Sequence, residues 1–226
     1  MNLLALESST RRLSVALWRD GMTSERGADI PNGGSALLLP WMLELLEEAG
    51  LSLADLDGIA FGAGPGGFTG LRLACGVAQG LALGLDRPLL AVPSLEALAL
   101  AGGGDKVFAC LDARMNEVYC AAYIVRDDVL ETVAAPYCAP PAAVSFPPGA
   151  GWMGCGDGFA AYPDLVKTAF SSIRADVWPT AAAVARLAAP VFAKGGGVDA
   201  ALGAPLYIRD KVALTTAERL ARGGSK

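Results

Sequence analysis

The sequence predicts an α/β protein with two lobes, each built on a mixed β-sheet flanked by helices. Two observations lead to this prediction. Over residues 3–102, apolar stretches of strand length alternate with apolar stretches of helical length. After three glycines at residues 102–104, a strand-turn-strand pattern like the one at the N-terminus begins again. We therefore expect one lobe over residues 1–103 and a second over 104–226.

The N-terminal segment predicts a three-stranded meander. The apolar residues 3–6 form a first strand, residues 7–12 a polar turn, and residues 13–18 a second strand. Asp20-Gly21 is a favourable hairpin turn, so a third strand is expected from Met22 to about Arg26.

Helices and buried strands should alternate in the rest of the first lobe. Ser35 is a candidate N-cap for a helix that ends near Ala49, because Gly50 follows it. The expected segments after it are, in order, a strand over 57–61, a glycine-rich loop over 62–70, a helix to about Leu85, a strand over 89–92 and a short helix capped by Ser94.

The second lobe repeats this order only in part. Strands are expected over 107–111 and 117–125, and the Pro- and Gly-rich residues 136–158 should be irregular. A helix over 180–194 with Pro190 near a kink follows, and then a tail over 205–212 that is extended or folds back. Periodicity alone predicts an α/β protein with mixed sheets. The order of elements resembles the duplicated fold of actin, sugar kinases and Hsp70, whose two lobes flank a cleft, and this specific fold is implied by the family resemblance given below.

Two acidic residues occupy matching places in the two lobes. Glu7 and Asp112 each end an apolar strand and precede a polar turn that contains arginine, Arg114 in the second case. In the actin-like fold such turns point into the cleft, where acids hold Mg²⁺ through water and orient an attacking water. The alternative is that both acids hydrogen-bond their own turns. With no Lys or His nearby, neither is assigned a catalytic role.

The composition excludes several classes of function. The chain has no histidine, so Ser-His-Asp and Cys-His catalysts and H-E-x-x-H zinc sites are impossible. Its net charge is −5, and binding of nucleic acid depends largely on Lys and Arg at phosphates. The chain should therefore not hold RNA alone, and we expect no metal site.

The sequence predicts neither a membrane span nor a signal peptide. The longest apolar stretch of helical character, residues 73–85, is interrupted by glycine and is shorter than the about 20 residues of a membrane span. No signal peptide is recognised at the N-terminus. The five cysteines are scattered and form no C-x-x-C pair, which indicates reduced thiols in a cytoplasmic protein.

The glycine-rich segment over residues 61–72 has two interpretations. A glycine loop before a helix is a candidate anion site, and it lacks the Lys-Ser/Thr ending of a Walker A loop. The other interpretation, which the residues alone favour, is a turn that lets strand and helix pack closely. The candidate cleft or anion-site residues are Glu7, Ser9, Thr10, Gly64, Gly66, Gly67, Thr69, Asp112 and Arg114.

The helix after this loop carries Gly76, Gly80 and Gly84, spaced so that they share one face. Glycine inside a helix costs about 1 kcal/mol relative to alanine, so close packing should compensate. Docking on the chain's own sheet is the favoured explanation, and a partner helix is the alternative.

The helix over residues 35–49 is apolar nearly all round. Such a helix is either central in its own domain or part of a subunit interface, and we favour the interface. The candidate interface residues on the two helices are Leu37, Leu38, Trp41, Met42, Leu45, Leu71, Leu73 and Val77.

Motifs spread over nearly the whole chain resemble those of the TsaB (YeaZ) family. The family's D-T-S/A-T turn corresponds to Glu7–Thr10, and its G-x-G-P-G-S-F-T-G-x-R loop to Gly62–Arg72. The A-Q-G-L-A segment is Ala78–Ala82, D-A-R-M-x-E-V-Y is Asp112–Tyr119, and the Y-L-R-x-x-V-A tail is Tyr207–Ala213. Three positions depart from the family pattern: Glu7 for Asp, Gly34 for His and Gly67 for Ser.

The resemblance implies the actin-like fold and a non-catalytic role. Members of the family pair with TsaD, a catalytic paralogue that transfers threonylcarbamoyl to adenosine 37 of tRNAs that read codons beginning with A. A TsaE-like ATPase joins the assembly, and without TsaD the family forms homodimers through helices of the first lobe. ATP and metal are then expected on the partner subunits, with no cofactor on this chain and tRNA bound only through the complex. The alternatives are an independent actin-like ATPase or kinase and, last, a glycoprotease.

Overall fold

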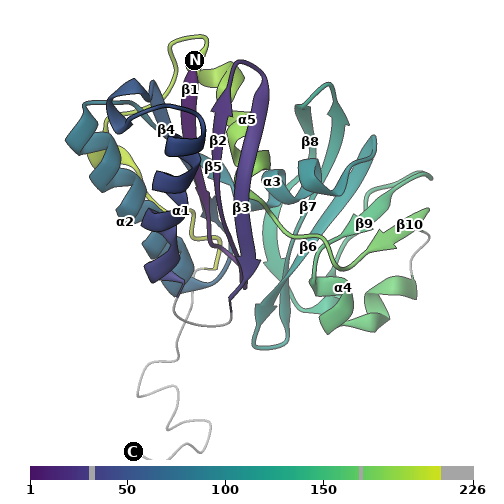
Figure 1. The fold of residues 1–226 in the computed structure, drawn as a ribbon. Helices are drawn as coiled ribbons and strands as arrows, with labels where there is room; N and C mark the ends of the chain where they lie inside the picture. The colour runs from purple at the N-terminus through teal and green to yellow at the C-terminus, as the bar shows by residue number, and fades with distance from the viewer. Residues whose placement is uncertain (31–33, 168–169, 210–226) are drawn as a thin grey trace, which may run out of the picture.

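The computed structural model describes residues 1–30, 34–167 and 170–209, and it contains two five-stranded mixed sheets (Figure 1). The strand order is β3-β2-β1-β4-β5 in the first sheet and β10-β9-β6-β7-β8 in the second. In each, three antiparallel strands are extended by two parallel ones. The predicted α/β fold with duplicated mixed sheets is therefore confirmed.

The first sheet begins with the predicted meander. Its strands are β1 (Asn2–Glu7), β2 (Arg12–Arg19) and β3 (Met22–Asp29). The hairpin turn is formed by Asp20 and Gly21, whose φ angles of 50° and 90° suit the twist of the flanking strands. The third strand is longer than predicted because its half-exposed polar residues still pair along the whole of β2.

The remaining elements of the first half follow in the predicted order. They are α1 (Ser35–Glu48), β4 (Gly58–Gly64), α2 (Phe68–Leu85), β5 (Leu89–Pro93) and α3 (Ser94–Gly102). The two predicted serine caps are wrong. Gly34 is the residue before α1 and Pro93 the residue before α3, and neither helix has a side-chain cap.

The second half departs more from the prediction. Strand β8 runs through Pro136, where an irregular segment was expected, because an edge strand tolerates a residue without an N–H. The elements are β6 (Lys106–Arg114), β7 (Glu117–Arg126), β8 (Val129–Ala139), β9 (Met153–Cys155), α4 (Gly158–Ala161), β10 (Ser172–Arg174) and α5 (Ala181–Phe192).

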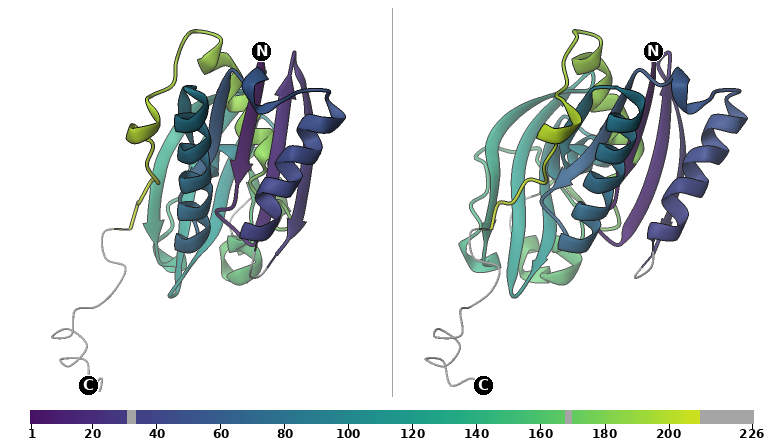
Figure 2. Two further views of the ribbon diagram at one scale, coloured as in Figure 1. Left: turned by 60° about the vertical axis from the view of Figure 1, so that its left-hand side comes forward. Right: turned by 90° about the vertical axis from the view of Figure 1, so that its left-hand side faces the viewer.

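Helices fill the space between the sheets and cover the outer face of the first one (Figure 2). Helices α1 and α2 bury their inner sides on the outer face of β1, β2 and β4. Helix α5 packs on the other face of the same sheet through Ala181, Val184 and Ala188, against Leu3 and Ala5. Helix α3 packs mainly on the second sheet. Each lobe thus contributes a helix to its neighbour, so a division at residues 103 and 104 stays a prediction.

The segment after α5 returns to the first lobe. The Gln79 side-chain amide on α2 donates to the carbonyl oxygens of Ala200 and Gly203, over 3.2 and 3.0 Å. The Leu206 N–H donates to the Ala63 oxygen over 2.7 Å. Of the two alternatives for the tail, extended or folded back, the structure shows the second as far as Arg209, and residues 210–212 lie outside the described residues.

Candidate functional site

The acid that ends β1 is buried inside its own lobe. Glu7 has no exposed surface, and its carboxylate accepts hydrogen bonds from the Ser9 N–H (2.5 Å) and the Ser94 hydroxyl (3.1 Å). The Ser94 hydroxyl in turn accepts from the Gly64 N–H. Burial raises the pKa of Glu7, and these hydrogen bonds act against the rise. The carboxylate is therefore held by protein groups and has no exposed oxygen for a ligand in this conformation.

The glycine-rich loop packs directly on the turn after β1. A Cβ on Gly66 would lie 2.3 Å from the Ser9 oxygen, and one on Gly70 would lie 1.8 Å from the Ser8 oxygen. The Gly67 N–H donates to the Ser9 oxygen over 2.7 Å, and the Ser8 hydroxyl donates to the Gly70 oxygen. These contacts support the structural interpretation, in which glycine permits close approach of two backbones.

The structure brings the first group of candidate anion-site residues together, at the β1–β2 turn and the start of α2. Ser9 and Gly64 are buried, whereas Gly67 and Thr69 are exposed. Thr10 accepts a hydrogen bond from the Arg12 N–H of its own turn. An anion site at this place stays a prediction.

The second candidate acid is engaged by its own turn and by a residue that the sequence analysis missed. Asp112 accepts from the Arg114 N–H (2.8 Å) and from the Tyr162 hydroxyl (3.3 Å), and its own N–H donates to Asp157 (2.9 Å). Burial raises the pKa of Asp157. The hydrogen bond from the Asp112 N–H lowers this pKa, whereas the negative charge of the Asp112 side chain raises it further. The Arg114 side chain is 87% exposed. The sequence offered one signal for Asp157, because it lies between two glycines directly after the short apolar segment 153–155.

Metal ligation finds little support in the described residues. Across residues 1–30, 34–167 and 170–209, no group of three or more Cys, Asp or Glu side chains comes close enough to hold an ion. The two candidate acids, Glu7 and Asp112, each accept hydrogen bonds from other groups of the chain.

The apolar helix α1 presents a different face from the predicted one. Leu38, Met42 and Leu45, expected at an interface, are at most 3% exposed because they pack on the first sheet. Leu37 and Trp41 are half-buried. The exposed apolar residues are instead Leu39 and Leu43, with 48% and 53% of their surface accessible. Leu38, Met42 and Leu45 are therefore core residues in this conformation, and an interface at α1 stays a prediction.

The glycines of α2 face away from the protein, so their predicted docking on the chain's own sheet is wrong. A Cβ on Gly76, Gly80 or Gly84 would meet no atom of the described part of the chain within 4 Å. The helix packs inward through its other side, which includes Leu71 (2% exposed), so Leu71 is also unavailable as an interface residue. The remaining candidates on α2, Leu73 and Val77, are half-buried.

Helix α2 is also long and apolar enough to cross a membrane, by length and composition alone. It is the one such helix in the described part of the chain. A helix that packs on a sheet passes the same test, and α2 does so through Leu71, Ala74, Cys75, Ala78 and Ala82.

The two outer helices together form one exposed surface, which we call the α1–α2 face. Both helices lie on the outer side of the first sheet (Figure 2), and Leu43 of α1 and Leu85 of α2 line one groove between their C-terminal ends. The face consists of Leu39, Leu43, Gly76, Gly80, Leu83 and Gly84. It is apolar, and along α2 its glycines leave open space beside the exposed Leu83, which suits close approach of another helix.

These features define an actin-like protein of duplicated topology. The acids at the ends of β1 and β6 are hydrogen-bonded within the chain, and the outer helices α1 and α2 present an exposed face. Comparison with known proteins agrees with this class. The model of the TsaD family, tRNA N6-adenosine threonylcarbamoyltransferase, matches residues 34–214. The chain belongs to the TsaB (YeaZ) family, within this larger group.

Similarity to individual relatives extends over almost the full chain. The tRNA threonylcarbamoyladenosine biosynthesis protein TsaB of Escherichia coli is 34% identical over 94% of this chain and 96% of its own length. TsaB of Haemophilus influenzae is 33% identical over 94% and 95%. The structure of YeaZ from Pseudomonas aeruginosa superposes with a TM-score of 0.86 and 39% identity, covering 91% of this chain and 99% of that one. A second structure, of a protein described as having similarity to peptidase YeaZ from Pseudomonas aeruginosa, has the same TM-score of 0.86 and 39% identity, covering 92% of this chain and 99% of that one.

Proposed function

We propose that this chain is a non-catalytic subunit in the biosynthesis of threonylcarbamoyladenosine in tRNA. In this proposal it dimerises with a TsaD-like catalytic paralogue and activates it, and a TsaE-like ATPase joins the assembly in the cytoplasm. The names of its relatives support the pathway. In isolation the same surface would join two copies of the chain.

The observation that carries the proposal is the exposed glycine stripe of α2. Each internal helix glycine costs about 1 kcal/mol relative to alanine. Among the described residues no packing compensates for this cost, because the stripe at Gly76, Gly80 and Gly84 has open space above it. Close approach of a helix from another subunit would supply the missing contacts. The exposed Leu39 and Leu43 on α1 extend the same surface.

The hydrogen bonds that the two acids accept from their own chain support a role without chemistry of its own. Glu7 is fully buried, and Asp112 accepts hydrogen bonds from its own turn and from Tyr162. The chain also has no histidine to act as a base or to ligate a metal. An independent ATPase or kinase would need an accessible acid in the cleft.

Reconstituted tRNA modification with the catalytic paralogue and the ATPase separates these roles. We expect Glu7→Gln and Asp112→Asn to retain activity and the double substitution Gly76→Leu, Gly80→Leu to abolish it. Ala193→Leu, at an exposed position after α5, is the matched control. Loss of activity in well-folded Glu7→Gln, together with binding of Mg²⁺-ATP to the isolated chain in calorimetry, would favour the ATPase instead.

A further inference from the structure

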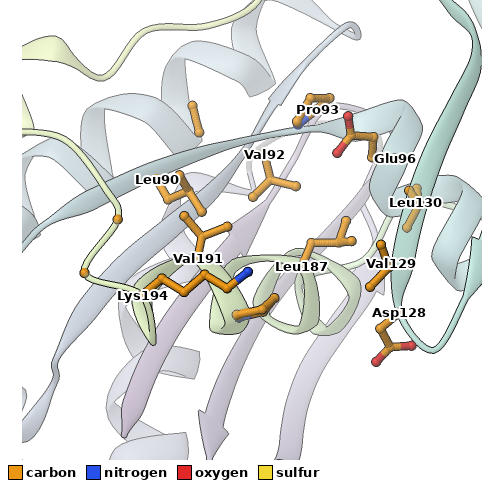
Figure 3. A pocket seen from close by; sticks show the side chains of 14 residues that line it. Leu90, Val92, Pro93, Glu96, Asp128, Val129, Leu130, Leu187, Val191 and Lys194 are labelled. Atoms are coloured by element: carbon orange, nitrogen blue, oxygen red, sulfur yellow. The ribbon is translucent and has the colours of Figure 1, made fainter.

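An open groove lies between β5, α5 and the start of β8, away from the elements that form the α1–α2 face (Figure 3). Its volume is about 550 Å³, which is within the range of sites for small organic ligands. Its walls are mostly apolar and come from both lobes. They include Leu90 and Val92 of β5, Leu130 of β8, and Leu187 and Val191 of α5.

One carboxylate in this groove has no partner among the residues that the structure describes. Glu96, in the first turn of α3, is half-buried, and within the described residues it makes no hydrogen bond or ion pair. Burial raises the pKa of Glu96. The other acid of the groove differs, because Asp128 accepts two hydrogen bonds from the Arg186 guanidinium. The start of α3 favours a negative charge at Glu96, and a cationic ligand in the groove would add the counter-charge that the described residues do not supply.

A second unpaired polar group lies near Glu96. The Tyr123 side chain on β7 is fully buried, and its hydroxyl has no hydrogen-bond partner in the described part of the chain. Burial, and then the neighbouring Glu96 charge, raise the pKa of this phenol. Unpaired buried hydroxyls are uncommon in folded proteins. Tyr123 is close enough to be affected by the Glu96 charge, whereas the other buried unpaired atoms of the described residues, Ser9 Oγ and Arg209 Nε, belong to the β1–β2 turn and to the segment beside Glu117.

The backbone of the edge strand adds polar groups to the groove. Leu89 exchanges hydrogen bonds with Val198 on the outer edge of β5. Because strand residues alternate, the N–H and C=O of Ala91 point to the same edge. The chain that pairs with Leu89 has turned away at this point, since the Gly196 N–H donates to the Val191 oxygen. Ala91 lines the groove, so its backbone groups are available to a ligand.

The charges at the two ends of the groove set the orientation of a ligand. Figure 3 shows Glu96 and Lys194 at opposite ends, with Val92, Leu187 and Val191 between them. Lys194 is exposed to solvent, where an ion pair contributes little, whereas Glu96 is partly shielded. We propose that the groove binds a small amphipathic cation, with an aliphatic body on the apolar wall and an ammonium group at Glu96.

The test is an NMR titration of the protein with labelled methyl groups, using hexylamine, hexanol and hexanoate as probes. Hexylammonium should shift the methyl signals of Val92, Leu130, Leu187 and Val191 and bind more tightly than hexanol. Hexanoate should bind most weakly. Glu96→Gln should weaken hexylammonium binding about tenfold or more and leave hexanol binding unchanged, since charged hydrogen bonds are the stronger ones. Glu131→Gln, on the exposed part of β8, is the matched control.

Equal binding of hexylammonium and hexanol to the wild-type chain would overturn the proposal, and so would unchanged hexylammonium binding in Glu96→Gln. The first comparison needs no variant, so it remains decisive even if Glu96→Gln folds poorly. Because the groove and the α1–α2 face use different residues, neither result depends on whether the chain binds a catalytic paralogue.

Discussion

The Ser94 hydroxyl, at the start of α3, donates a hydrogen bond to the Glu7 carboxylate at the end of β1, 87 residues away in sequence. The bond joins the first residue of α3, directly after β5, to the last residue of β1. The carboxylate is consequently part of the lobe's interior, which is a structural role.

Removal of this hydroxyl should destabilise the first lobe. We expect Ser94→Ala to lower the free energy of unfolding by about 1–3 kcal/mol, because a buried carboxylate loses a donor. Urea unfolding at neutral pH measures the change. Ser24→Ala, at an exposed position of β3, should change it by less than about 0.5 kcal/mol. Equal effects of the two substitutions would contradict a buried, donor-dependent Glu7.

Burial of Glu7 should also make stability depend on pH. Its pKa is raised above the ordinary value of 4.5 in the folded state, so the folded protein holds the proton more firmly than the unfolded chain. This contribution to stability is complete below pH 4.5 and is lost as the pH rises through the folded-state pKa. Glu7→Gln should therefore gain stability relative to the wild type as the pH increases across this window. Urea unfolding of both proteins over a series of pH values measures the difference, and a relative loss would show that the carboxylate is favourably ionised.

Two glycines of α2 should respond to alanine in opposite ways. Gly70→Ala would place a Cβ 1.8 Å from the Ser8 oxygen, so we expect a loss of about 3 kcal/mol or more. Gly80→Ala places its Cβ in open space and should stabilise the helix by up to about 1 kcal/mol. Chemical denaturation of both variants checks this. A destabilising Gly80→Ala would mean that the stripe packs against the chain itself.

The two faces of α1 should separate folding from binding. Leu38→Glu places a charge in the core and should unfold the protein or cost about 3–5 kcal/mol, whereas Leu39→Glu and Leu43→Glu should leave stability within about 0.5 kcal/mol. The second pair should nevertheless weaken self-association or binding of the paralogue. Circular dichroism and sedimentation measure the two properties. Unchanged association in the Leu39→Glu, Leu43→Glu double variant would remove α1 from the proposed interface.

The C-terminal segment should loosen locally when its anchor on α2 is removed. Gln79→Ala loses the bonds to Ala200 and Gly203, which we expect to cost about 1–2 kcal/mol. Hydrogen exchange at the Leu206 amide, which is bonded to Ala63, should accelerate, while exchange at the Ala183 amide in α5 should not. Equal protection of Leu206 in both proteins would show that Gln79 does not hold the segment.

Much of the first lobe followed from local sequence signals. Asp20-Gly21 determined the hairpin, and the alternation of apolar segments located β4, α2 and β5. The same signals failed at Pro136, because whether a proline is tolerated depends on the strand lying at an edge, which is a property of the whole sheet.

The direction of a helix face was less predictable than the helix itself. Gly76, Gly80 and Gly84 share a face by spacing, but Ala74, Ala78 and Ala82 share another one that is just as small. Only the position of the sheet decides which of them is buried. For the same reason the sequence grouped Leu38 with Trp41 as interface residues, although the core takes Leu38 and leaves Leu39 exposed. Asp157 was missed because it meets Asp112 across two strands of the second sheet.

The central claim is that the α1–α2 face binds a related subunit. The most direct measurement is the affinity of the chain for a TsaD-like paralogue by isothermal titration calorimetry, with the wild type, the Gly76→Leu, Gly80→Leu double variant and the Ala193→Leu control. The account predicts that the double variant is at least as thermally stable as the wild type and binds at least a hundredfold more weakly, about 2.7 kcal/mol, whereas the control binds normally. Wild-type affinity in a stable double variant would contradict it.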